Sequence, residues 1–203
     1  WSPENKQWNW TDVGSNTNSE ESTDTDVVHI VAEELGQLSP KAQSLLMIAS
    51  CLGSQFCVIA LTCITSCINE VNLRDDLTGE DAIRVPSDDE IDDILATLQE
   101  AVNLRLVAEC DELTYAFEHD RVQHAAYMSG TSDINKTHFK IGKILLQYSL
   151  GLGIENNTSS FLLAVTQLNQ GSEIIKDNKA KARLAQLNLD AANCVLLKSG
   201  FEN

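Results

Sequence analysis

Residues 104–117 read LRLVAECDELTYAF, and this stretch decides the fold that we predict. Two short apolar runs, Leu104–Cys110 and Leu113–Phe117, stand on either side of the acidic pair Asp111-Glu112. Short apolar runs with polar residues between them are typical of a β-hairpin. We therefore expect two antiparallel strands here, in a chain whose other patterns are helical.

The residues before the hairpin predict helices. Ser39-Pro40 combines an N-cap with a proline at the first helical position, which predicts a helix through about Cys51, closed by Gly53. A second apolar segment, Phe56–Ile68, predicts a helix packed against the first. Residues 70–86 are mostly polar and contain glycine and proline, so they predict a loop.

A third helix is predicted more sharply. Ser87 and Glu90 match the capping-box pattern, and an apolar stripe follows at helical spacing: Ile91, Ile94, Leu95, Leu98 and Val102. Three helices followed by a hairpin are typical of a winged helix. We predict a winged-helix-like domain over residues 27–130.

The flanking segments complete the predicted organisation of a mainly α chain. Residues 14–26 contain no large apolar residue, so residues 1–26 are expected to be a linker or tail. Residues 131–203 carry three further helical patterns with interspersed alanines, which predict tetratricopeptide-like antiparallel helices. The first residue is Trp1, and the helical pattern continues almost to Asn203. We therefore expect the chain to be an excerpt of a longer protein and its last helical segment to be truncated.

Charge and composition limit the classes of partner that the chain is expected to bind. Asp and Glu number 30 against 14 Lys and Arg, giving a net charge of −16 that repels phosphate backbones and anionic lipid. The third helix, which would enter a DNA groove, is expected to expose acidic side chains: Asp88, Asp89, Asp92, Asp93 and Glu100. Nucleic acid and membrane are therefore not expected as partners. The six cysteines have largely apolar neighbours, which predicts reduced core thiols and a cytoplasmic protein.

No catalytic or metal site is predicted. The phosphate-binding loop G-x-x-x-x-G-K-[ST] is absent, since Gly142-Lys143 is followed by Ile144. Cys63 and Cys67 lack the C-x-x-C spacing of zinc sites, and the acidic run at residues 88–93 lacks a calcium-loop pattern. We expect a chain that is not an enzyme and holds no cofactor.

Residues 117–127, FEHDRVQHAAY, follow the hairpin and carry the candidate site. His119, Asp120 and Arg121 would lie where a strand passes into a helix. Such a junction presents free N–H groups and a titratable imidazole, which suit a phosphate. The alternative is that Asp120 caps the helix and His119 satisfies a local hydrogen bond. Both interpretations remain open from the sequence.

At this segment the chain resembles the STAND-class signalling ATPases, in which an AAA-type ATPase module is followed by a winged helix and helical repeats. The similarity covers about residues 8–200 and is most specific at residues 117–127. Its other matching stretches are residues 8–10, 38–40, 49–56, 141–146, 168–171 and 184–189. Gln167 departs from the family pattern, which tends to have histidine there, and residues 198–201 match only loosely.

The resemblance implies a function. In that class a winged-helix histidine contacts the phosphate of the bound nucleotide, a role that would fall on His119, with Asp120 and Arg121 beside it. ATP or ADP with Mg²⁺ would be held by an upstream module of the same protein, and kinase-like, histidine-kinase or cyclase domains would lie elsewhere in it. The chain would be a non-catalytic regulatory arm that also meets protein partners. A protein-interaction module with no nucleotide-sensing role is the alternative.

Overall fold

The computed structural model describes residues 31, 33–74, 77, 85–130, 133–154 and 157–198. The predicted linker at residues 1–26 lies outside these residues. A helical turn at residues 33–37 precedes the first complete helix. The elements that follow are α2 (Pro40–Leu52), β1 (Gln55–Cys57), α3 (Val58–Cys67), α4 (Asp88–Asn103), β2 (Val107–Asp111), β3 (Thr114–Phe117), α5 (Asp120–Met128), α6 (Ile134–Leu152), α7 (Thr158–Gln170), the short 3-10 helix η1 (Ser172–Ile174) and α8 (Asn178–Lys198).

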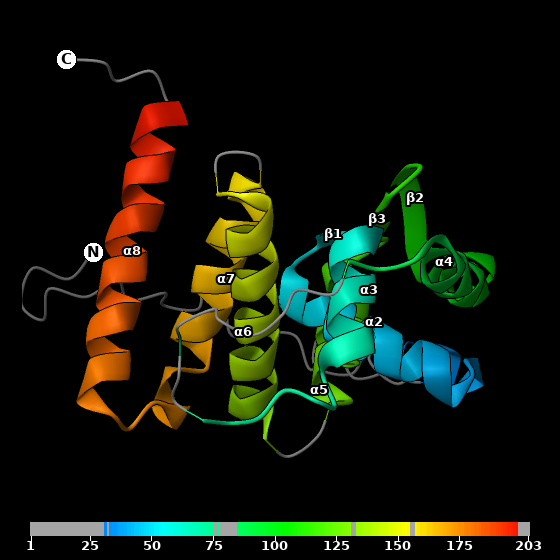
Figure 1. Cartoon of the computed structure of the whole chain (residues 1–203). Helices are drawn as coiled ribbons and strands as arrows, with labels where there is room; N and C mark the ends of the chain where they lie inside the picture. The colour runs from blue at the N-terminus through cyan, green and yellow to red at the C-terminus, as the bar shows by residue number, and fades with distance from the viewer. Residues whose placement is uncertain are drawn as a thin grey trace, which may run out of the picture.

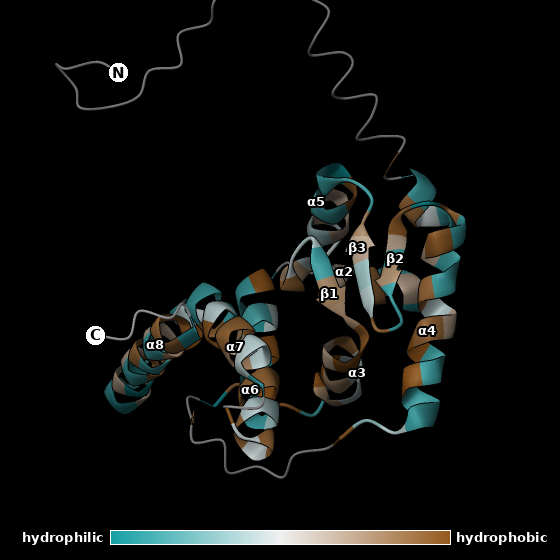
Figure 2. Ribbon diagram, turned by 90° about the horizontal axis from the view of Figure 1, so that it is seen from above, coloured by the Kyte–Doolittle hydropathy of each residue, from teal (hydrophilic) through white to brown (hydrophobic). Residues whose placement is uncertain are grey.

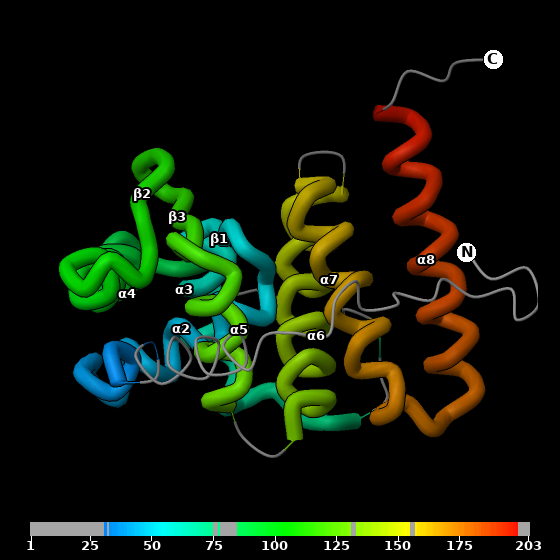
Figure 3. Tube along the Cα trace, turned by 180° about the vertical axis from the view of Figure 1, so that it is seen from behind, coloured from blue at the N-terminus to red at the C-terminus, as the bar shows by residue number. Residues whose placement is uncertain are grey.

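The fold is mainly helical with one small antiparallel sheet, which confirms the predicted fold class. The strand order is β1-β3-β2, so that β1 pairs with the second strand of the hairpin. Helix, strand, two helices and hairpin follow one another in the order of a winged helix. Helices α6, α7 and α8 run antiparallel beside one another, on the side of the molecule away from α4 (Figure 1). The same arrangement is seen from behind in Figure 3.

The prediction of one helix over residues 56–68 was wrong at its start. Residues Gln55–Cys57 form β1, and α3 begins only at Val58. Phe56 is buried in the sheet, with its ring 6.3 Å from that of Tyr115 and 5.5 Å from that of Phe117. A three-residue strand is stabilised by a partner about sixty residues away, so local periodicity could not distinguish it from helix.

The hairpin was predicted correctly, but its limits differ. Helix α4 continues to Asn103, and a turn with Arg105 at φ 56° leads into β2, so residues 104–106 are not strand. The connection lies at Glu112-Leu113 rather than at Asp111-Glu112, after an irregularity between Glu109 and Asp111. A bulge adds a residue to one strand and shifts the turn, which an alternation pattern does not reveal.

Both predicted helix starts are confirmed. The Ser39 hydroxyl accepts a hydrogen bond from the Ala42 N–H at 3.2 Å, and Ser87 and Glu90 form the capping box of α4. The two helices that follow α2 differ in hydropathy. In Figure 2, α3 is mostly hydrophobic, whereas hydrophilic and hydrophobic residues alternate along α4. Asp88, Asp89, Asp92 and Asp93 are exposed as expected.

Glu100 was expected to be exposed, and this was wrong. Its carboxylate is half-buried and accepts hydrogen bonds from both the backbone N–H and the hydroxyl of Ser39, each at 3.0 Å. The carboxylate of α4 thereby holds the residue that caps α2. The sequence pattern identifies Ser39 as a cap. It does not reveal that Glu100, 61 positions later, accepts hydrogen bonds from Ser39.

We predict that Glu100→Ala lowers the free energy of unfolding by about 1.5–3 kcal/mol, because hydrogen bonds to a charged group contribute about that much. Urea unfolding followed by circular dichroism measures the change. Gln99→Ala is the matched control, since Gln99 is exposed one position earlier on α4 and its side chain bonds to Asn103 on the same helix. Equal losses in the two variants would contradict the role of Glu100.

The predicted loop at residues 70–86 contains no helix or strand among its described residues, and cations from the helical segment hold it. Lys140 on α6 donates to the carbonyl of Ile68 at 3.0 Å. Lys143 is only 4% exposed and donates to the carbonyl of Arg74 at 3.2 Å. Arg183 on α8 reaches the carbonyl of Leu77, which is itself buried. The connection between α3 and α4 is therefore tied to α6 and α8.

Two glycines let α6 and α7 pack closely. A Cβ atom at Gly142 would lie 2.7 Å from Cγ of Leu168. A Cβ atom at Gly171 would lie 2.5 Å from the backbone nitrogen of Phe139. Side chains are absent at these two positions because the neighbouring helix occupies the space.

Candidate functional site

The candidate site lies at the start of α5, directly after β3. The Phe117 N–H donates to the carbonyl of Ser54 at 2.8 Å, and the Glu118 N–H donates to the carbonyl of Leu106 at 3.1 Å. On the helical side, Val122 and Ala126 are buried. The junction is thus fixed in the sheet on one side and in the core on the other, while the residues between them face solvent.

His119 is the N-cap residue of α5, and its side chain is not used by the helix. Its carbonyl accepts from the N–H groups of Val122 at 3.0 Å and Gln123 at 3.2 Å, but its side chain makes no capping bond. The interpretation that Asp120 caps the helix is wrong, because Asp120 is the first helical residue. A carboxylate in the first turn complements the positive end of the helix instead.

The structure brings the three predicted residues together. His119, Asp120 and Arg121 are all exposed and line a pocket of about 380 Å³, together with Val31 and Val122. Asp120 alone of the three also lines a second pocket, of about 480 Å³, between α2, α5, α6 and α7. An imidazole, a carboxylate and a guanidinium are therefore presented side by side at a helix N-terminus.

Behind this junction lies a buried polar network that the sequence did not predict. The Tyr127 hydroxyl lies 3.0 Å from Nε2 of His138, and Nδ1 of His138 lies 2.7 Å from Oε1 of Gln167. Gln167 then donates from Nε2 to the carbonyl of Cys51 at 2.6 Å. His138 is 3% exposed and Gln167 is 1% exposed, so these two side chains are shielded from water, while Tyr127 is half-buried.

The tautomer of His138 follows from this geometry. A carbonyl can only accept, so the Gln167 amide nitrogen must face Cys51 and its oxygen must face the imidazole. Nδ1 of neutral His138 therefore carries the proton, and Nε2 accepts from the Tyr127 hydroxyl. Every member of the network has a fixed role as donor or acceptor.

Two glutamines cap the C-terminal end of α2. Gln167 on α7 donates to the carbonyl of Cys51, and Gln123 on α5 donates to the carbonyl of Ser50 at 3.1 Å. The last carbonyls of a helix have no partner within it, so these bonds satisfy groups that would otherwise be unpaired. The end of α2 thereby fixes α5 relative to α7, and with it the direction in which His119 is presented.

The cysteine prediction was right in part. Cys51 and Cys63 are buried, and burial raises the pKa of the Cys51 thiol to about 11 and that of Cys63 to about 12. Both stay protonated and unreactive at neutral pH. Cys57 and Cys110, however, are exposed. They lie on β1 and β2, the two edge strands, where alternate side chains point away from the core.

No group of three or more His, Cys, Asp or Glu side chains among the described residues is placed to hold a metal ion. In the same part of the chain, no helix has both the length and the apolar content needed to cross a bilayer. The acidic run at residues 88–93 lies in the first two turns of α4.

Comparisons of the chain with protein-family models, with curated proteins and with solved structures found no match. The resemblance to STAND-class ATPases therefore rests on the sequence stretches given above, and the function it implies stays a prediction.

Proposed function

We propose that this chain is the non-catalytic regulatory arm of a larger, cytoplasmic, nucleotide-switched signalling ATPase. In this proposal the start of α5 contacts a nucleotide held, with Mg²⁺, by another module of the same protein. The observation that carries it is the exposed His119 side chain, which makes no capping bond and stands on a rigid junction beside Arg121. The resemblance at residues 117–127 supports the same role.

The chemistry of the junction suits a phosphate group. An imidazole and a guanidinium both donate hydrogen bonds to phosphate oxygens, and the helix N-terminus adds a partial positive charge. Asp120 offsets part of that charge, so His119 and Arg121 would make the contact. The buried network behind α5 supports the proposal because it keeps this junction in one orientation.

The experiment measures ADP release from the protein that carries both this chain and its nucleotide module. His119→Leu is expected to raise the ADP dissociation rate roughly 10-fold to 100-fold, the loss that follows from one charge-assisted hydrogen bond. His124→Leu is the matched control, since His124 is also exposed on α5 but lies away from the His119 pocket. An ADP release rate that is unchanged in His119→Leu would refute the proposal.

A second candidate is a protein-interaction module without nucleotide sensing. What favours it is the C-terminal half of α8, where large apolar side chains are exposed: Leu189, Val195, Leu196 and Leu197, the last 80% exposed. Exposed apolar side chains grouped in this way are typical of surfaces that meet another protein. Under this candidate the His119 variant retains the wild-type ADP release rate, and Leu189→Ser with Leu196→Ser reduces partner binding.

A further inference from the structure

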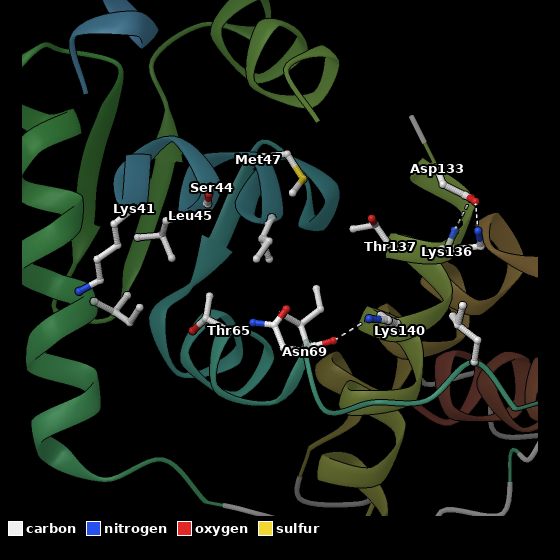
Figure 4. A pocket seen from close by; sticks show the side chains of 14 residues that line it. Lys41, Ser44, Leu45, Met47, Thr65, Asn69, Asp133, Lys136, Thr137 and Lys140 are labelled. Carbon is white, nitrogen blue, oxygen red and sulfur yellow. Dashed lines mark hydrogen bonds and ion pairs between the residues drawn. The ribbon is translucent and has the colours of Figure 1, made fainter. Parts of the chain in front are cut away.

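The largest of the pockets described here lies apart from the α5 junction, between α2, α3, α4 and α6 (Figure 4). Its volume is about 700 Å³, which is within the range of pockets that hold small ligands, about 300–1,000 Å³. In Figure 4 the labelled residues of α2 lie on one side, Thr65 and Asn69 lie opposite them, and the labelled residues of α6 lie at one end. Ile94 of α4 also lines the pocket. A pocket of this volume suits a small molecule.

The interior of this pocket is largely apolar. Its apolar side chains come from α2, the connection after α3, and α4: Leu45, Met47, Ile48, Ile68, Leu73 and Ile94. Met47 is flexible and polarizable, so it can adapt to the shape of a ligand. Leu73 is 36% exposed and would lose contact with water if an apolar ligand lay against it. The pocket therefore favours a ligand with an apolar body.

Three lysines surround it, in a chain with 14 basic residues and a net charge of −16. Two are already neutralised, because Lys41 forms an ion pair with Asp93 and Lys136 forms one with Asp133. Lys140 is different. Its ammonium group points toward the pocket and donates to the carbonyl of Ile68, and no described carboxylate lies within ion-pair distance of it.

A lysine ammonium has three donors, of which this bond uses one. The ammonium group of Lys140 lies at the α6 end of the cavity, where Asp133 also lines the wall but is already paired with Lys136. We propose that the pocket binds a small amphipathic carboxylate, with its apolar body between α2 and α3 and its carboxylate on Lys140. Because the ligand would contact both α2 and α6, it would couple the winged-helix part to the helical segment. This proposal is independent of nucleotide sensing by His119.

Titration of the 203-residue chain with decanoate tests it, with decanol as an uncharged probe of equal length. Nuclear magnetic resonance is expected to show saturable shifts confined to α2, α3, the connection that follows it, α4 and α6, with decanol binding about 10-fold more weakly. Lys140→Gln is expected to weaken decanoate binding about 10-fold and to leave decanol unchanged. Lys140→Arg keeps the charge and should retain decanoate binding.

Lys179→Gln is the matched control, because Lys179 is exposed on α8 and the described lining of this pocket includes no residue of α8. The proposal is overturned if millimolar decanoate gives no saturable shifts, or if the shifts map elsewhere. It is also overturned if decanol binds as tightly as decanoate, or if folded Lys140→Gln binds decanoate like the wild type. Binding by an acidic apolar peptide but not by decanoate would make the surface a protein-docking site instead.

Discussion

Gly171→Ala is expected to lower the free energy of unfolding by about 3 kcal/mol, at the upper end of the usual cost of overpacking. The added methyl would lie 2.5 Å from the Phe139 nitrogen and 2.8 Å from the Asn135 carbonyl oxygen, both backbone atoms of α6. Backbone cannot move aside as a flexible side chain can, so α6 and α7 would have to separate. Thermal unfolding should shift by roughly 6–12 °C in a chain of this length.

The control for this prediction is Gly36→Ala. A Cβ atom at Gly36 would meet nothing within 4 Å, and the residue lies in a helical turn, so alanine there should be neutral or slightly stabilising. Gly171 itself has φ −88°, a conformation open to any residue, so only the lack of space requires glycine. If Gly171→Ala unfolds with the same midpoint as Gly36→Ala, the close approach of the two helices is not as described.

Gln167→Leu is expected to cost about 2–4 kcal/mol of unfolding free energy, because two buried polar groups would each lose their partner. The carbonyl of Cys51 and the Nδ1–H of His138 both bond to this one amide. Leucine fills similar space but offers neither a donor nor an acceptor. Urea unfolding measures the loss, and the imidazole resonances of His138 should report an altered environment.

Thr166→Leu is the neighbouring control, since Thr166 is exposed on α7 and lines the same pocket without joining the network. A change within about 0.5 kcal/mol is expected there. Tyr127→Phe removes only the hydroxyl at the far end of the network. The double variant Tyr127→Phe with Gln167→Leu should lose less unfolding free energy than the two single variants lose together. Tyr127 and Gln167 both bond to His138, so their contributions are coupled. Strict additivity would contradict a connected network.

Much of the fold could be predicted because its signals are local. Ser39-Pro40 and the Ser87 capping box each mark the start of a helix by a pattern no longer than four residues. The apolar residues at helical spacing in α4 indicate which face of that helix is buried. β1 was missed because its evidence lies on β3, about sixty residues later. The structure also gives a physical reason for the glycines at positions 142 and 171, where the facing helix leaves no room for a side chain.

The candidate site, too, could be predicted only where its signals are local in the sequence. The grouping of His119, Asp120 and Arg121 could be predicted because adjacent residues at a strand-to-helix junction stay together. The partners of Gln167, His138 and Lys140 could not be predicted. A glutamine within an apolar helix indicates a buried hydrogen bond, but the acceptor lies on another helix, and sequence spacing does not say which.

Because distant glutamines cap α2, the end of this helix is completed late during synthesis of the chain. Cys51 and Gln167 are 116 positions apart, so at about 5–20 residues per second the ribosome needs roughly 6–23 s to supply the second after the first. During that interval only water can satisfy the Cys51 carbonyl, although Gln123 is already available to the Ser50 carbonyl, and the side chains of α2 that later face α7 are uncovered. The nascent winged-helix part should therefore be a better substrate for chaperones than the finished protein.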